Sequence, residues 1–274
     1  MGLGLSKILQ GLQNKLAGTR PADEPAKDLQ SLLSTEQKRC AEHYGSAPGH
    51  CELCAQDTIF VRHGEWNREQ YRCVRCGSIP RWRALYRVLE AQFSQWRDLT
   101  MHESSPGGRA SDVLQQQCRA YEASHYFPNQ PLGTSYRGFR NENLEQLTLA
   151  DASVDLFISQ DVMEHILRPS LALQEIARVL KPGGAHVFTI PWKPHLATFS
   201  RVTPTANGMA HHAEAEYHGN PIDKKGSLVI TGWGNDTVEI MDAMSGMQTD
   251  IVSIERADLG IEGERLEVFV SRKH

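Results

Sequence analysis

Four of the six cysteines form two pairs with the spacing of a tetrahedral metal site. Cys51 and Cys54 are separated by two residues, as are Cys73 and Cys76, and eighteen residues lie between the pairs. A C-x-x-C turn lets two thiolates converge on one side of a Zn²⁺ ion, while a hairpin brings the second pair to the other side. Because four protein ligands leave no position open for substrate, the pattern predicts a structural zinc ribbon. Four buried cysteines without a metal are the alternative interpretation.

Histidines at two places have the chemistry of a general base. His165 follows an apolar run, and ligands bind at the carboxyl ends of the strands in open α/β sheets. His218 lies in a polar stretch after residue 190 that is long enough to form a lid. The two histidines are expected to converge on one acceptor hydroxyl, with His165 as the base and His218 helping to bind the acceptor. A structural His165 is the alternative.

The polar stretch holds other histidines, namely His195, His211 and His212. Solvated loop histidines are one interpretation of them. A second metal site that joins His211 and His212 to His218 is another.

The elements that must position these residues follow from the apolar pattern. From about Leu99 onward, apolar runs alternate with helical patterns, which predicts a parallel α/β sheet. The strongest strand covers 153–159, a helix over 171–180 is expected to end at the glycines of 181–184, and a strand follows at 185–190. Further strands are expected at 99–103, 119–123, 248–254 and 265–271. The last two are predicted to form an antiparallel hairpin with a short charged loop.

A helix is also predicted directly after the second cysteine pair, over residues 78–93. Ser78 is a candidate cap, Pro80 suits the first turn, and apolar residues recur at helical spacing, so the helix is expected to dock on the rest of the chain. Residues 51–97 hold eight arginines and five acidic residues. A solvated or packing face is the main interpretation of this mild basic excess, and nucleic-acid contact is the alternative.

The central strand and the helix after it carry a family resemblance. The run DASVDLFISQDVMEH at 151–165, the run EIARVLKPGG at 175–184 and the strand that follows resemble class I S-adenosylmethionine-dependent methyltransferases. The resemblance extends from Leu99 to His274. The double C-x-x-C segment that ends in CGSIPRWR resembles a subgroup of bacterial members with a zinc-ribbon-like segment. The resemblance implies a doubly wound, Rossmann-like sheet of seven strands, S-adenosylmethionine as cofactor, and methyl transfer to a hydroxyl or amine of a small-molecule or glycan acceptor.

The resemblance also assigns cofactor residues around the first strand. In the family, an acidic residue at the end of this strand precedes glycines spaced by two, where the backbone approaches the cofactor. Glu103 and Gly107 match this pattern, while Ser105 and Arg109 stand where glycines are usual.

Four more positions complete the expected cofactor site. Glu122, expected at the end of the second strand, matches the acid that binds the ribose hydroxyls in the family. Asn143 stands at the position of the Asp that reads adenine, and Leu144 follows it. Asp161, within the run after the central strand, is counted with them.

Composition limits the remaining choices. The 274 residues are 40% hydrophobic and have a formal charge of −4, and no apolar run approaches the roughly 18 residues of a membrane span. A cytoplasmic protein with reduced thiols is therefore expected, and the charge argues against nucleic acid as a partner. The oligomeric state is left open. An RNA methyltransferase that grips RNA through the zinc ribbon and a non-catalytic scaffold remain alternative functions. The predicted organisation is a flexible segment at 1–48, a zinc ribbon with its helix at 49–97 and a methyltransferase domain at 98–274.

Overall fold

The computed structural model describes residues 29–206, 208–220 and 222–274. The first 28 residues of the segment predicted to be flexible lie outside this range. The rest of that segment forms η1 (Leu29–Leu32), α2 (Thr35–Tyr44) and the start of β1 (Ser46–Cys51), so the prediction of flexibility is wrong there. The reason is local: Ser34 and Gln37 form a reciprocal capping box that begins α2.

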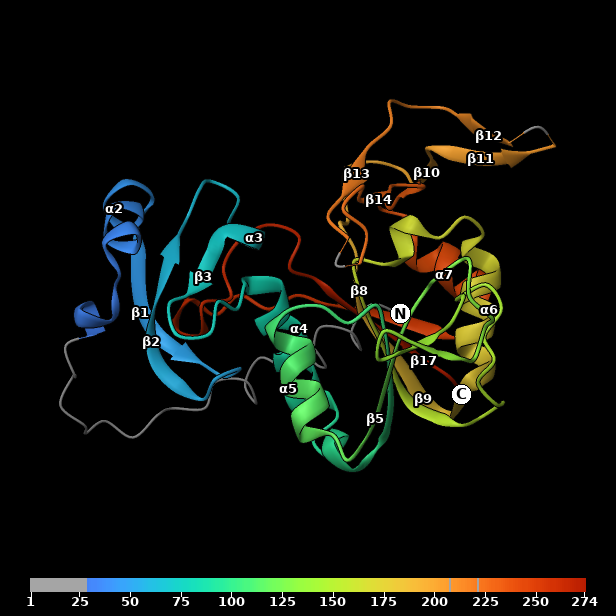
Figure 1. The fold of residues 1–274 in the computed structure, drawn as a ribbon, viewed down its shortest axis with the longest axis horizontal. Coiled ribbons are helices and arrows are strands. Elements are labelled where there is room, and N and C mark those ends of the chain that lie inside the picture. Colours follow the sequence, from blue (N-terminus) through green and yellow to red (C-terminus); the bar gives the residue numbers. More distant parts are fainter. Residues whose placement is uncertain (1–28, 207, 221) are drawn as a thin grey trace, which may run out of the picture.

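The cysteine pairs belong to a small antiparallel sheet, which we call the cysteine lobe (residues 29–79). In this sheet β1 pairs with β2 (Gln56–Arg62), and β2 pairs with β3 (Tyr71–Cys73). The short helix α3 (Asn67–Gln70) lies between the last two strands. Figure 1 shows the lobe in blue and cyan, beside the larger sheet.

The larger sheet has eight strands in the order β16-β17-β9-β8-β4-β5-β7-β6. Five neighbouring strands, from β9 to β7, are parallel, and the outer ones are antiparallel to their neighbours. The strands are β4 (Thr100–Ser104), β5 (Ala120–His125), β6 (Ser135–Tyr136), β7 (Phe139–Asn141), β8 (Val154–Gln160), β9 (Leu180–Thr189), β16 (Gln248–Val252) and β17 (Val268–Arg272). The mixed α/β fold is confirmed.

The prediction of seven strands falls one short, because β6 folds back on β7. The two residues between them, Arg137 and Gly138, both have positive φ, as a two-residue hairpin of type I′ requires. Arg-Gly is not one of the residue pairs usually found in this turn, and β6 has only two residues, so the sequence pattern did not reveal the eighth strand.

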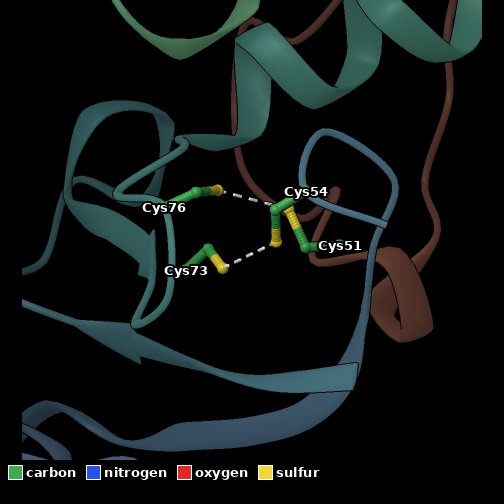
Figure 2. Close-up of side chains that lie close together, drawn as sticks. All are labelled: Cys51, Cys54, Cys73 and Cys76. Carbon is green, nitrogen blue, oxygen red and sulfur yellow. Dashed lines mark hydrogen bonds between the residues drawn. The ribbon is translucent and has the colours of Figure 1, made fainter. Parts of the chain in front are cut away.

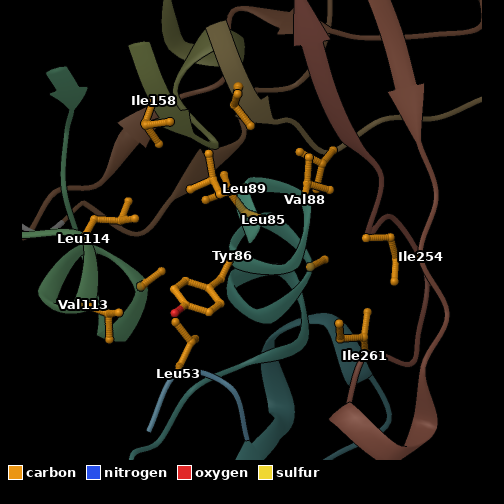
Figure 3. Packing of buried hydrophobic residues seen from close by; sticks show 14 of the residues in the cluster. Leu53, Leu85, Tyr86, Val88, Leu89, Val113, Leu114, Ile158, Ile254 and Ile261 are labelled. Atoms are coloured by element: carbon orange, nitrogen blue, oxygen red, sulfur yellow. The ribbon is translucent and has the colours of Figure 1, made fainter. Parts of the chain in front are cut away.

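Helices cover both faces of the larger sheet (Figure 1). The helices α4 (Pro80–Gln92) and α5 (Arg109–Gln117) pack on one face. There, Leu85, Val88 and Leu89 of α4 share one buried cluster with Val113 and Leu114 of α5 and Ile158 of β8 (Figure 3). The helices α6 (Pro169–Val179) and α7 (Thr237–Ser245) bury a separate cluster on the other face. Between α4 and β4 lies the single turn η2 (Trp96–Asp98).

Two predicted helix boundaries differ from the structure. Pro80 is the first residue of α4, as expected, but Ser78 does not cap the helix, and its hydroxyl lies 3.3 Å from the sulfur of Cys51 instead. The glycines at 183–184 do not end α6, which stops at Val179, four residues earlier than Gly183. They lie inside β9, where a Cβ on Gly184 would be 2.9 Å from the carbonyl oxygen of Asp155 on the neighbouring strand.

The predicted terminal hairpin exists, but its connection is not a short charged loop. Residues 253–267 leave the sheet, form the turn η4 (Ala257–Leu259) and pack against the cysteine lobe and α4. Buried apolar residues hold them there, and Ile254 and Ile261 of this loop appear in Figure 3. The loop is long because it ties two parts of the molecule together.

An insertion at 191–236 lies between β9 and α7 and consists of short antiparallel ladders (Figure 1). These pair β10 (Phe199–Ser200) with β15 (Thr231–Gly232), β11 (Val202–Thr205) with β12 (Gly208–His211), and β13 (Tyr217–His218) with β14 (Ser227–Leu228). It packs on η3 (Met163–His165), the turn that follows β8. Within the described part of the chain, no helix has both the length and the apolar character needed to cross a bilayer.

Candidate functional site

The four predicted metal ligands lie together at one end of the cysteine lobe (Figure 2). The sulfurs of Cys51 and Cys76 are 3.6 Å apart, and those of Cys54 and Cys73 are 4.0 Å apart. Sulfurs that share one zinc ion in a tetrahedron, each about 2.3 Å from it, lie about 3.8 Å apart. The hydroxyls of Ser78 and Thr58 contact two of the sulfurs at 3.3 Å, as outer partners of a metal site do. The donor set and its spacing therefore fit a tetrahedral metal ion.

Glu103 is the next-to-last residue of β4, close to the strand end predicted for it, but its carboxylate is committed to internal contacts. It is fully buried and accepts hydrogen bonds from the Ser111 hydroxyl at 2.7 Å, the Tyr121 hydroxyl at 2.6 Å and the Gln160 amide at 3.1 Å. Burial raises the pKa of Glu103. The Ser111 hydroxyl also accepts the backbone N–H of Gly107 at 2.9 Å, so Glu103 acts by fixing the loop that follows it.

The loop at 105–108 turns sharply and leaves its backbone accessible. Ser105 and Gly108 have positive φ values of 57° and 79°. A Cβ added to Gly108 would lie 2.1 Å from the indole of Trp82, whereas one added to Gly107 would meet no atom within 4 Å. A side chain at position 108 would therefore clash with Trp82. At Gly107, three residues after the end of β4, there is free space next to the backbone. This arrangement fits a ligand that approaches the main chain closely.

Glu122 lies in the middle of β5, and its predicted place at the strand end is wrong. It pairs in register with His102, and the strand continues for three residues because Ser124 and His125 are buried. The Glu122 side chain is 51% exposed and lies 3.5 Å from the His102 ring and 3.7 Å from Arg140. It lines a cavity of about 340 Å³ on the flank of the sheet, whose lining includes no residue of the 105–108 loop.

Asn143 and Leu144 follow β7 at the same edge of the sheet as Glu103. The side-chain oxygen of Asn143 accepts the backbone N–H of Glu145 at 3.0 Å, which closes a local turn. Leu144 is buried against the cluster beneath α6. The oxygen expected to read adenine therefore already has a partner within the chain.

Asp161, directly after β8, is bound by arginines of the cysteine lobe and α4. Arg68 donates to both carboxylate oxygens at 2.7 Å, and Arg81 of α4 lies 3.5 Å from one of them. Burial raises the pKa of Asp161, but the two arginines outweigh this and hold it well below its usual range. Asp161 has a φ of 52°, a strained value for a residue with a side chain.

His165 and His218 come together, as the sequence predicts, with their ring centres 5.1 Å apart. His165 lies in η3, and His218 lies on β13 of the insertion. Between them is Glu164, whose Oε1 is 3.7 Å from His165 Nε2 and 3.4 Å from His218 Nδ1. Contact with Glu164 raises the pKa of His218.

The other histidines of the insertion do not join this group. The Nε2 atom of His212 is 2.8 Å from the Thr203 hydroxyl, and His195 and His211 are exposed. Within residues 29–206, 208–220 and 222–274, neither His211 nor His212 belongs to a cluster of potential metal ligands, so the predicted grouping with His218 is wrong. His211 ends β12, which pairs with β11, whereas His218 lies on β13, which pairs with β14.

Sequence patterns did not reveal three residues of this site. Arg68 is one of eight arginines in a mildly basic stretch, and its partner Asp161 is 93 residues away. Gln160 and Glu164 flank the residues that the resemblance singled out, but burial alone distinguishes them. The only local signal for Glu164 is its position beside His165 after a buried strand, and that signal does not distinguish it from an exposed glutamate.

Comparison with known proteins identifies part of the chain. Residues 108–188 match the sequence model of the family described as "Methyltransferase domain", a stretch that begins just before α5 and ends within β9. A stretch of 49 residues is 49% identical to dimethylglycine N-methyltransferase of Parasynechococcus marenigrum and covers 18% of each chain. Another, of 52 residues, is 40% identical to a probable S-adenosylmethionine-dependent methyltransferase of Mycolicibacterium smegmatis, over 19% of this chain and 20% of that one. The chain thus spans about a fifth of the length of the curated relatives it matches.

Several solved structures with a partly similar fold are methyltransferases. One is the 1,6-didemethyltoxoflavin-N1-methyltransferase of Burkholderia thailandensis, solved with S-adenosylhomocysteine, at 14% identity and a TM-score of 0.45 over 70% of this chain and 78% of that one. Another is CalS10, an amino pentose methyltransferase of Micromonospora echinaspora, at 12% identity and a TM-score of 0.43 over 69% and 88%.

Proposed function

We propose that this chain is an S-adenosylmethionine-dependent methyltransferase that acts on a hydroxyl or amine of a small-molecule or glycan acceptor. The observation that carries the proposal is the match of residues 108–188 to the methyltransferase domain family. The matched segment contains β5, β7 and β8, and it ends within β9. Carboxyl ends of parallel strands form the ligand-binding edge of such a sheet.

The loop at 105–108 is the proposed place for the amino-acid end of the cofactor. Its support is the open backbone of Gly107 and the fixed turn that Glu103 and Ser111 hold. Asn143 and Leu144, at the end of β7, remain the proposed neighbours of adenine. S-adenosylmethionine supplies an electrophilic methyl group, so the protein must align the acceptor and, for a hydroxyl, remove its proton.

His165 is the proposed base. Its Nδ1 lies 2.8 Å from the carbonyl oxygen of Leu228, a group that only accepts, so Nδ1 carries the hydrogen. In the neutral ring, Nε2 is then the unprotonated nitrogen and is ready to receive a proton. His218, held on β13 beside Glu164, is proposed to bind the acceptor.

The cysteine lobe is proposed to hold a structural zinc ion through Cys51, Cys54, Cys73 and Cys76. Two of its arginines form ion pairs within the chain, Arg62 with Glu262 and Arg68 with Asp161, and Arg87 of α4 pairs with Glu52 of the lobe. Arginines engaged in this way offer little attraction for phosphates, which favours a small acceptor over RNA.

Calorimetry with S-adenosylhomocysteine tests the cofactor, and release of that product in the presence of nucleotide-sugars, amines and bulk RNA tests the acceptor. Binding in the micromolar range or tighter, together with turnover of a small acceptor, is the expected result. The absence of binding at saturating protein would support the non-catalytic scaffold, and turnover with RNA alone would support the RNA enzyme.

A further inference from the structure

Glu164 is a fully buried carboxylate that lacks a hydrogen bond. Its side chain is 0% exposed, and among the described residues neither of its oxygens has a hydrogen-bond partner. Arg68 is the nearby cation, but it directs its hydrogen bonds to Asp161, Glu69 and the carbonyl of Arg265. A buried carboxyl group without a hydrogen bond is costly and rare in a folded protein. Glu164 therefore calls for a ligand that is not part of the chain.

Two imidazole nitrogens face this carboxylate. His165 Nε2 and His218 Nδ1 lie 3.7 and 3.4 Å from Oε1, and one donor atom from each of the three side chains lies within 4.8 Å of the others. These separations are longer than a good hydrogen bond, which peaks near 2.9 Å. Nitrogen and oxygen ligands that each lie about 2.1 Å from one ion are about 3.0–3.5 Å apart in octahedral or tetrahedral geometry. The 3.4 Å separation falls within this range and the 3.7 Å separation lies just above it, so the three side chains are placed to converge on one ion.

An outer hydrogen bond holds the His165 ring in the orientation that a metal requires, and a longer outer contact lies behind the His218 ring. The Nδ1–H of His165 donates to the Leu228 carbonyl at 2.8 Å, which leaves the Nε2 lone pair on the side of Glu164. The Nε2 atom of His218 lies 3.4 Å from a carboxylate oxygen of Glu216, and its Nδ1 faces Glu164. A ligating histidine commonly donates its other N–H to a carbonyl or a carboxylate, as His165 does, whereas the contact between His218 and Glu216 is longer than a good hydrogen bond.

We propose that Glu164, His165 and His218 form a second metal site, which binds a divalent transition-metal ion. Two histidines and one carboxylate leave at least one coordination position open, unlike the four cysteines, which fill a tetrahedron. The site is also accessible, because the side chains of His165 and His218 are 15% and 31% exposed. The proposal of metal binding does not depend on the proposed function. Only the idea that the acceptor hydroxyl occupies the open position rests on that function. When the metal is bound, His165 is a ligand, so the role of base proposed above applies to the protein without a metal at this site.

Cobalt titration of the full-length protein, purified with zinc in the cysteine lobe, tests the site. One further equivalent of Co²⁺ should bind and give the weak visible bands of a nitrogen and oxygen site, without the intense charge-transfer band of thiolate ligands. Glu164→Gln and His218→Ala should each weaken this binding at least about 100-fold. His212→Ala, in the same insertion, should leave it unchanged. Circular dichroism and thermal unfolding check that each variant is folded.

Three outcomes would overturn the proposal. The first is no second equivalent at millimolar Co²⁺, and the second is equal binding by folded Glu164→Gln. The third is a thiolate band, which would place the cobalt in the cysteine lobe. Calorimetry with S-adenosylhomocysteine on the same samples separates the two proposals. Protein that binds the second ion but no S-adenosylhomocysteine refutes the function alone, and the reverse result refutes the metal site alone.

Discussion

Arg68 of the cysteine lobe donates two hydrogen bonds of 2.7 Å to the two carboxylate oxygens of Asp161, at the carboxyl end of β8. This paired geometry is the strongest form of arginine–carboxylate contact. It joins the small sheet to the edge of the large sheet at which the proposed cofactor and acceptor sites lie. The cysteine lobe thus contributes Arg68 to the edge of the large sheet where the sites are proposed.

Arg68→Ala should destabilise the fold by about 3 kcal/mol, the lower end of the range for a buried pair, because it leaves the Asp161 carboxylate, which is 17% exposed, without its main partner. Chemical denaturation measures this change. Arg119→Ala, which removes an exposed partner of Asp98, should cost no more than about 1 kcal/mol. Adding Asp161→Asn to Arg68→Ala should restore part of the loss, and a lack of any recovery would contradict the pairing.

Cys73→Ser should remove most of the zinc, which is expected at about one ion per chain in the unaltered protein. Because metal binding and local folding are coupled, the variant should also melt at a lower temperature and lose solubility. Elemental analysis and thermal unfolding measure both effects. Cys40→Ser, which changes a cysteine of α2 outside the cluster, is the matched control. Normal stability of metal-free protein would refute a structural ion.

Gly107→Val should weaken S-adenosylhomocysteine binding at least about tenfold, or about 1.4 kcal/mol, while leaving the stability of the fold nearly unchanged. The stability should not change because a side chain at Gly107 meets no other atom of the chain. The affinity should fall because the side chain fills the space proposed for the cofactor. Calorimetry and thermal unfolding measure the two quantities. In the same assay Glu122→Ala should change affinity no more than about twofold, since Glu122 lies in mid-strand. A large loss in Glu122→Ala would return the ribose contact to that residue.

His165→Ala should lower turnover by about 10²–10⁴-fold, the usual contribution of a general base, with little change in S-adenosylhomocysteine affinity. His218→Ala should act mainly on the KM for the acceptor. His195→Ala changes an exposed histidine of the same insertion and should have no effect. If His218→Ala alone abolished turnover, the base would be His218, and His165 would have a structural role.

Acid should destabilise the protein partly through His125. This ring is buried against Phe127 and Phe139, and burial lowers the pKa of His125 to about 4. Above pH 6.5 or so the ring is neutral in both states, and as the pH falls toward 4 only the unfolded chain takes up a proton, so stability is lost. Between about pH 7 and pH 4, the free energy of unfolding of His125→Phe should fall by on the order of 3 kcal/mol less than that of the unaltered protein. Equal losses in denaturant titrations would place the acid sensitivity elsewhere.

The sequence was most informative where local chemistry repeats. The spacing of Cys51, Cys54, Cys73 and Cys76 predicted a cluster that the structure brings together, and the apolar run of β8 predicted the central strand. The meeting of His165 with His218 also followed, because strand ends and the insertion face the same edge of the sheet.

What the sequence did not indicate depends on distant partners. No local pattern pairs Arg68 with Asp161, and none distinguishes the buried Glu164 from an exposed glutamate. Glu122 was misplaced because a strand's end depends on what its last residues pack against. Here Ser124 and His125 are buried by the sheet, which extends β5 beyond the point expected.

The loop at 253–267 has a consequence for how the chain is synthesised. It supplies Glu262 to Arg62 and the carbonyl of Arg265 to Arg68, contacts that join residues 200 and 197 positions apart. The cysteine lobe therefore leaves the ribosome long before the segment that completes its packing exists. During that interval its apolar surface lacks Ile254 and Ile261, and contacts of such long separation form slowly. Chaperone dependence during translation should accordingly be concentrated in the first part of the chain, even though the residues that relieve it are encoded near the other end.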